Sequence, residues 1–206
     1  MTGGELRELL ARIMDSLEAQ AEEFRALDAA VGDGDLGVTV KAVAAAVRDL
    51  MAELEPTASV STVVQRSAMT VAKAAPSTMS ALVAAGLLKA AKEVGDDPVG
   101  VDGAAGAGAA FVATVGAKGK ASRGDKTLLD ALGPAVDALQ AQAGVGGDGP
   151  AAISAAVDAA RQGVSETTPL VGRKGRARWM GDRSMGQPDP GAVVVQRFLE
   201  AWQQHS

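Results

Sequence analysis

Apolar residues recur at steps of three and four positions along almost the whole chain, and no other feature restricts its fold as strongly. This spacing places apolar side chains on one face of an α-helix. In the first run they are Leu6, Leu9, Leu10, Ile13 and Leu17. Further runs start after residue 37 and cover residues 60–74, 78–95, 102–115, 125–139, 150–168 and 190–202. The pattern predicts eight helices and no strand.

Several predicted helix ends carry characteristic residues. Asp189 followed by Pro190 is typical of a helix start, and it favours a helix over a short strand at Val193–Val195. Asp125 is a suitable N-cap for the sixth helix. The segment from Gly172 to Gly191 is the longest stretch without a helical pattern. A connection of that length in a compact domain is more often functional than not.

The composition indicates how these helices pack. Of 206 residues, 47% are hydrophobic but only 2% are aromatic, and there is no Tyr. The core must therefore consist of Ala, Leu, Val and Met, whose small side chains let helices approach closely. Short connections favour antiparallel neighbours. The sequence predicts an all-α protein, a barrel or bundle of eight antiparallel helices, with a single domain over residues 1–206.

Charge and residue counts exclude several classes of function. The net charge of −5 argues against nucleic-acid binding, which needs a basic surface. The absence of Cys excludes thiolate catalysis and Cys-ligated zinc. No signal peptide or membrane-length apolar run is seen, so we expect a cytoplasmic protein without a membrane span. The single histidine, His205, lies beside the C-terminus and is poorly placed for phosphohistidine or base chemistry.

Three carboxylates lie close together among glycines after the first predicted helix. Asp28 falls at its end, and Asp33 and Asp35 follow in Val-Gly-Asp-Gly-Asp-Leu-Gly. Carboxylate oxygens are the ligands that hard cations prefer, and glycines let a phosphate approach the backbone. The alternative is a turn with a helix cap. Metal binding is favoured because three neighbouring carboxylates repel one another unless they are neutralised. An EF-hand is a poor fit, because its glutamate position falls on Ala44.

A second constellation is basic. The segment from Gly172 to Gly191 concentrates cations in an otherwise acidic chain, and guanidinium groups match phosphate oxygens. A lid over an anionic ligand is favoured over a solvated loop. Its cations are Arg173, Lys174, Arg176, Arg178 and Arg183.

Two further segments are weaker signals. Residues 118–127 combine glycines and lysines at a helix start, which a capped helix with solvated lysines explains. Residues 74–80 place hydroxyls at another helix start, where an N-cap is the simplest interpretation. There is no Walker A motif, which disfavours a P-loop enzyme.

Taken together, these motifs resemble the nucleotide-binding L subunit of dihydroxyacetone kinase, a domain that also forms the C-terminal half of single-chain ATP-dependent kinases. The resemblance rests on the aspartate motif at 27–37, Gly-Asp-Lys-Thr at 124–127, and Gly-Arg-Ala, Gly-Asp-Arg-Ser-Met-Gly and Asp-Pro-Gly within 175–191. It covers essentially the whole chain. It implies a barrel of eight antiparallel helices with the nucleotide, ADP or ATP, at one end.

The resemblance also implies roles for particular residues. Asp28, Asp33 and Asp35 would hold two Mg²⁺ ions that bridge the phosphates, and no catalytic residue is expected beyond this metal site. The chain departs from the family at Leu36, where relatives commonly carry His or Cys, and at Ala74–Ala75, which replaces two glycines. The expected nucleotide contacts are Leu36, Gly37, Val38, Thr39, Pro76, Ser77, Gly119, Leu128, Arg176, Asp189, Pro190 and Gly191.

The resemblance further implies a phosphotransferase that acts with a partner. A substrate-binding K-type subunit would hold a small hydroxyketone, and Arg178 is a candidate contact with it. The phosphoryl donor is either a phosphotransferase-system protein or free ATP, and the sequence does not separate the two. A homodimer is also left open. The alternatives are a nucleotide-binding regulatory module of a related sugar or ketone kinase system, and a purely structural helical bundle.

Overall fold

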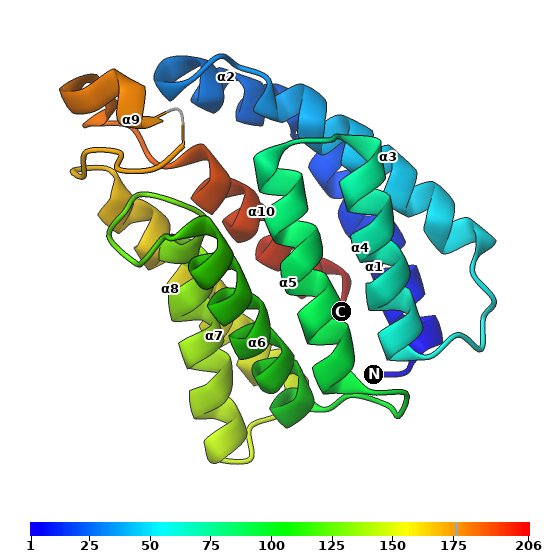
Figure 1. Ribbon diagram of the computed structural model, residues 1–206. Coiled ribbons are helices and arrows are strands. Elements are labelled where there is room, and N and C mark those ends of the chain that lie inside the picture. The colour runs from blue at the N-terminus through cyan, green and yellow to red at the C-terminus, as the bar shows by residue number, and fades with distance from the viewer. Residues whose placement is uncertain (176) are drawn as a thin grey trace.

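The computed structural model describes residues 1–175 and 177–206, and regular secondary structure within them is helical (Figure 1). Eight long helices of 15 to 19 residues are described, together with three shorter ones. The long helices are α1 (Gly3–Ala19), α3 (Leu36–Glu53), α4 (Val60–Ala74), α5 (Thr78–Val94), α6 (Val101–Gly119), α7 (Leu129–Gly144), α8 (Gly149–Thr167) and α10 (Pro190–His205). The shorter ones are α2 (Ala21–Val31), α9 (Ala177–Met180) and the 3₁₀ turn η1 (Gly181–Ser184).

The long helices form a closed ring. In chain order each contacts the next, from α1 through α3, α4, α5, α6, α7 and α8 to α10, and α10 returns to α1. The prediction of an all-α barrel or bundle of eight antiparallel helices is confirmed. The segment Val193–Val195 lies inside α10, so the helical interpretation of that apolar run is also confirmed.

The first predicted helix is in fact two. α1 ends at Ala19, and Gln20 has φ −94° and ψ 6°, which leaves the helical range before α2 begins at Ala21. The apolar period of Leu6 to Leu17 belongs to α1 alone. Asp28 therefore lies on a separate helix, α2, which runs along one end of the molecule (Figure 1).

The predicted start of the sixth helix is also wrong. α7 begins at Leu129, and Asp125 does not cap it. The Asp125 carboxylate instead accepts a hydrogen bond from the backbone N–H of Ser122 (2.9 Å). Asp130, one turn later, accepts from the backbone N–H groups of Thr127 (2.7 Å) and Gly124. The loop before α7 is therefore organised by the helix's own first-turn aspartate.

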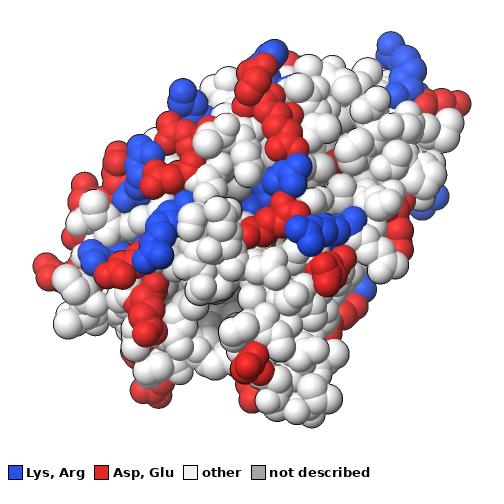
Figure 2. All heavy atoms as spheres, turned by 180° about the vertical axis from the view of Figure 1, so that it is seen from behind, with Lys and Arg blue, Asp and Glu red and all other residues white. Residues whose placement is uncertain are grey.

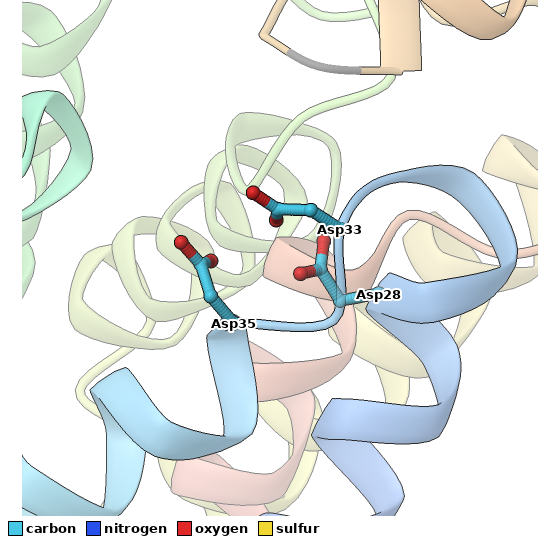
Figure 3. Close-up of side chains that lie close together, drawn as sticks. All are labelled: Asp28, Asp33 and Asp35. Carbon is cyan, nitrogen blue, oxygen red and sulfur yellow. The ribbon is translucent and has the colours of Figure 1, made fainter.

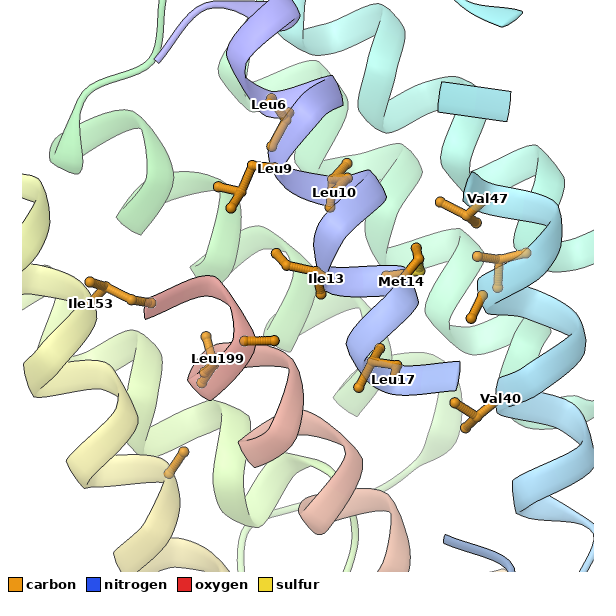
Figure 4. Close-up of a cluster of buried hydrophobic side chains, with 14 of the residues drawn as sticks. Leu6, Leu9, Leu10, Ile13, Met14, Leu17, Val40, Val47, Ile153 and Leu199 are labelled. Carbon is orange, nitrogen blue, oxygen red and sulfur yellow. The ribbon is translucent and has the colours of Figure 1, made fainter. Parts of the chain in front are cut away.

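Small side chains allow close helix contacts in the core. At Gly163 of α8, an added Cβ atom would lie 2.0 Å from the carbonyl oxygen of Asp130 in α7, so only glycine fits. The main apolar cluster surrounds α1, and side chains of α3 and α10 face it (Figure 4). Ile13 and Phe24 are completely buried within this cluster. The interior is thus filled largely without aromatic rings, as the composition predicted.

The surface carries both signs of charge. Figure 2 shows acidic and basic side chains interspersed over the face opposite to that of Figure 1. An ion pair joins two helices: Arg197 of α10 pairs with Glu23 of α2 at 2.6 Å. Among the described residues, no helix combines the length and the apolar character needed to cross a membrane.

The alternating direction of the helices gathers four loops at one end of the barrel. They are the α2–α3 loop, the α4–α5 loop, the α6–α7 loop and the long α8–α10 loop, residues 168–189. Contacts close the α8–α10 loop and join its end to the α6–α7 loop: Asp189 donates its backbone N–H to Thr167 Oγ1 (2.9 Å), and an added Cβ atom at Gly191 would lie 3.6 Å from Leu128. Every segment that the sequence singled out for chemistry lies at this end.

Candidate functional site

The three predicted aspartates come together at the loop end of the barrel. Asp28 is in the last turn of α2, Asp33 is in the following loop, and Asp35 is at the N-cap position of α3. One carboxylate oxygen from each lies within 4.8 Å of the others. Figure 3 shows the three carboxylates grouped on one side of the loop. Asp28 is half-buried, whereas Asp33 and Asp35 are exposed to solvent.

The loop backbone holds this grouping in place. Gly34 has φ +76°, a left-handed conformation that glycine adopts without strain. Asp28 Oδ2 accepts a hydrogen bond from the backbone N–H of Leu36 (3.2 Å), which ties the two ends of the loop together. An added Cβ atom at Gly37 would lie 2.2 Å from the carbonyl oxygen of Ala21, so α3 starts directly against α2. These two glycines therefore allow the backbone conformation of the loop and the close approach of α3 to α2.

A simple helix cap does not account for the cluster. The side chain of Asp35, at the N-cap position, makes no capping hydrogen bond to α3. Asp28 uses one oxygen for the N–H of Leu36, yet its carboxylate still belongs to the group of three. Three carboxylates at this separation are a donor set that suits a hard divalent cation such as Mg²⁺.

The residues predicted to contact a nucleotide occupy the same end of the barrel. Leu36, Gly37, Val38 and Thr39 form the first turn of α3, and Val38 is exposed. Ser77 is the N-cap of α5, where its hydroxyl accepts from the backbone N–H of Ser80 (3.1 Å). This hydroxyl therefore has the capping role that the sequence indicated.

The remaining predicted contacts lie on three other elements. Pro76 precedes α5, and Gly119 is the last residue of α6. Leu128 is buried beside Gly191 in the first turn of α10. Arg176 lies outside the described residues.

Asp189 and Pro190 start α10 as predicted, but the carboxylate of Asp189 is buried. It accepts from the backbone N–H of Ala192 (2.8 Å), which makes it the N-cap of α10. Burial raises the pKa of Asp189 to about 7, and the charge of Asp130 adds to this. The hydrogen bonds from backbone N–H groups and the charge of Lys126 act in the opposite direction.

Lys126 is the residue that the sequence interpretation missed. Only 1% of it is exposed, whereas the pattern of residues 118–127 predicts a capped helix with solvated lysines. Its Nζ donates to the carbonyl oxygens of Leu170 (2.8 Å) and Ser184 (2.6 Å). Burial lowers the pKa of Lys126, and the charge of Asp189 partly offsets this. Its position within Gly-Asp-Lys-Thr was the signal that could have singled it out.

The basic stretch predicted at 172–191 makes up most of the α8–α10 loop. It is less irregular than expected, because α9 and η1 lie within it. η1 contacts α2, the helix that carries Asp28. Arg178 packs over the ring of Trp179 at 5.2 Å from its centroid, and Trp179 is 77% exposed.

The raised pKa of Asp189 leads to a prediction for stability. The folded protein binds a proton there at pH values where the unfolded chain, with an ordinary Asp pKa, does not. Between about pH 4 and 7 this lowers the free energy of unfolding as pH rises, by up to about 4 kcal/mol. Asp189→Asn keeps the capping oxygen and removes the titration. We expect urea unfolding to show a smaller loss of stability for the variant from pH 4.5 to 8 than for the wild type. Parallel pH curves would contradict the assignment.

Comparison with known proteins connects this arrangement to a family. Residues 30–204 match the DAK2 domain. The ADP-binding subunit DhaL of PEP-dependent dihydroxyacetone kinase 2 from Listeria innocua is 32% identical over 178 residues, which are 85% of this chain and 82% of that protein. L-erythrulose kinase from Pectobacterium atrosepticum is 35% identical over 190 residues, or 91% of this chain and 32% of the relative. Human triokinase/FMN cyclase is 30% identical, with 94% of this chain and 33% of that protein covered.

Solved structures show the same fold. The native dihydroxyacetone kinase of C. freundii superposes with a TM-score of 0.77 at 25% identity, over 97% of this chain and 34% of that one. The same enzyme in complex with AMP-PNP and Mg²⁺ also gives 0.77, at 23% identity. The chain thus spans about a third of the length of several relatives but most of the Listeria subunit. The resemblance drawn from the sequence motifs is confirmed, and the chain belongs to the DAK2 domain family.

Proposed function

We propose that this chain is the Mg²⁺-nucleotide-binding part of a kinase that phosphorylates a small hydroxyketone. The observation that carries the proposal is the group of three carboxylates, Asp28, Asp33 and Asp35, at the loop end of the barrel. The relatives named above are kinases or kinase subunits, and one of them is named as an ADP-binding subunit. A metal held by these carboxylates reconciles their charge with that of the phosphates.

The bound metal and the protein would each stabilise the negative charge of the nucleotide phosphates. Bound Mg²⁺ would neutralise and bridge the nucleotide phosphates, which is the main electrostatic requirement of phosphoryl transfer. The chain supplies helix starts: α3, α5, α7 and α10 all begin at this end, and the first N–H groups of a helix attract anions. We assign nucleotide contacts to Leu36, Gly37, Val38, Thr39, Pro76, Ser77, Gly119, Leu128, Asp189, Pro190 and Gly191, and keep Arg176 as a sequence-based candidate.

The acceptor would be held by another protein or domain. The only histidine, His205, lies 3.0 Å from Ser16 Oγ of α1, and it ends α10 about 24 Å from Asp189 at the other end of that helix. The carboxylates of the cluster are committed to the metal and are poor bases. A K-type subunit that positions the ketone is therefore required. Arg178 and the exposed Trp179 are candidate contacts with this subunit, because Arg and Trp are enriched among the residues that contribute most to binding at protein–protein interfaces.

The test begins with the nucleotide. Mass spectrometry of gently purified protein shows whether ADP is retained, and calorimetry with ADP or ATP shows whether binding needs Mg²⁺. Retained ADP favours a phosphotransferase-system donor, and freely exchanging ATP favours direct use of ATP. Failure of both nucleotides to bind in the presence of Mg²⁺ would contradict the proposal. Sedimentation during the same preparation would show whether the chain is a homodimer.

The α8–α10 loop should respond to the nucleotide. It is rich in cations and glycines, as expected of a lid over phosphates. We expect amides from Gly172 to Asp189 to exchange more slowly with deuterium once ADP and Mg²⁺ are added. This slowing of exchange by ADP and Mg²⁺ should be absent in Asp35→Asn, which serves as the control without nucleotide binding. Unchanged exchange in the wild type, with binding verified, would mean that the loop is only a connector.

A further inference from the structure

Lys126 contacts the two arms of the α8–α10 loop at once. Leu170 lies on the arm that leaves α8, and Ser184 closes η1 on the returning arm. The Lys126 Nζ donates to both of their carbonyl oxygens, at 2.8 and 2.6 Å. An ammonium group in a buried position is costly unless it is hydrogen-bonded. The hydrogen bonds to these two carbonyls therefore offset the cost of burying the ammonium group at a position where an apolar side chain would otherwise pack.

The backbone at Lys126 is held in an uncommon conformation. Its φ is +62°, a left-handed value that non-glycine residues rarely adopt. The Asp130 carboxylate fixes this turn, because it accepts from the N–H groups of Gly124 and Thr127 on either side of Lys126. Such strain persists only where the surroundings determine it, and it is typical of functional sites.

Other hydrogen bonds join the same elements. The N–H of Gly172 donates to Ser184 Oγ (2.9 Å), which links the two arms directly. The N–H of Arg173 donates to the carbonyl oxygen of Asp125 (3.1 Å), one residue before Lys126. The base of the loop is thus fastened, whereas α9 projects beyond it, next to α2 in Figure 1.

The turn that contains Lys126 also contains a residue of the proposed nucleotide site. Leu128 lies two residues after Lys126 and packs beside Gly191 at the start of α10. A change at Lys126 can therefore act on the loop above the site and on the wall of the site together. A solvated lysine could do neither.

We propose that Lys126 is a positioning residue whose buried ammonium group fastens both arms of the α8–α10 loop to the α6–α7 loop, so that the loop closes over the bound nucleotide phosphates in one orientation. The inference rests on the proposed function for its ligand. The anchoring itself is a property of the free chain. It assigns Lys126 no contact with the nucleotide or the metal.

The test compares Lys126→Met with Lys118→Met, a matched change at an exposed lysine near the end of α6. In the free protein, Lys126→Met should speed deuterium exchange of amides in residues 170–186 by about 10-fold or more, because it removes two hydrogen bonds from a charged group and the loss of even one has an effect of this size. Exchange in α1 and α3 should stay as in the wild type. With ADP and Mg²⁺, the ADP dissociation rate should rise by about the same factor, while Mn²⁺ binding at the carboxylates stays unchanged.

Further variants keep the test decisive. Lys126→Arg retains a donor and should restore part of the loop protection, and Ser184→Ala should loosen the same loop less than Lys126→Met. If Lys126→Met does not fold, Lys126→Gln replaces it, because Gln also lacks the ammonium group but keeps a polar side chain. Wild-type exchange of the loop in Lys126→Met, or in Lys126→Gln where Lys126→Met does not fold, would overturn the anchor. Failure of the wild type to bind ADP would overturn the proposed function but leave the exchange result in the free chain standing.

Discussion

Asp33→Asn and Asp35→Asn are each expected to weaken Mg²⁺-dependent ADP binding by more than about 100-fold, since even groups that only orient metal ligands contribute about 10- to 100-fold. Each change removes an anionic ligand from a site that must also accept negative phosphates. Asn keeps the size of the side chain and one oxygen, so the fold should be preserved. Calorimetric titration with ADP at fixed Mg²⁺ measures the effect.

The matched control is Asp97→Asn, which makes the same chemical change at an exposed position in the loop before α6. That loop is at the opposite end of the barrel from the carboxylates, so the control should bind ADP as the wild type does. Circular dichroism and urea unfolding of all three variants verify that they are folded. Wild-type affinity in both Asp33→Asn and Asp35→Asn would remove the metal assignment.

The second large effect concerns turnover. The chain alone should phosphorylate dihydroxyacetone at least about 1000-fold more slowly than the chain with its substrate-binding partner, because positioning of the acceptor and management of its proton contribute factors of this size. The measurement is a coupled kinase assay with ATP, Mg²⁺ and purified chain, with and without a candidate K-type protein encoded beside it. Where ATP fails, a phosphotransferase-system donor replaces it.

Asp35→Asn combined with the partner serves as the control, and this variant should show no kinase activity. Robust turnover by the chain alone would contradict the two-component interpretation and would require a substrate pocket on this chain. Nucleotide binding without turnover, with every donor and partner supplied, would favour the regulatory alternative.

Much of the fold could be predicted because its information is local. Periods of three and four positions repeat within single helices, and helix starts such as Asp189–Pro190 are marked by adjacent residues. Two boundaries were wrong for physical reasons. The break at Gln20 occurs without Gly or Pro, so no residue signals it. At α7 no side chain caps the helix: Asp125 accepts from the N–H of Ser122, and Asp130, inside the first turn, accepts from the N–H of Thr127 in the preceding loop.

The difference between local and long-range contacts also explains why the three aspartates were predicted and Lys126 was not. Asp28, Asp33 and Asp35 are close in the sequence, so one loop is enough to group them. Lys126 has its partners 44 and 58 residues away, and its role exists only once the α6–α7 and α8–α10 loops meet. The charge and composition of the surrounding segment therefore do not separate a buried lysine from a solvated one, and only the Gly-Asp-Lys-Thr motif marks this position.

The composition and the position of Trp179 together make the protein suited to optical measurement. The chain has two tryptophans and no tyrosine, so excitation at wavelengths above the absorption of phenylalanine gives emission from Trp179 and Trp202 alone. Trp202 is half-buried on α10, with its ring 5.9 Å from that of Phe198. Trp179 stands in solvent on the α8–α10 loop, beside the cationic group of Arg178. With Trp202 replaced by Phe, the remaining indole becomes an intrinsic fluorophore whose emission wavelength follows the movement of that loop in real time, without any attached dye.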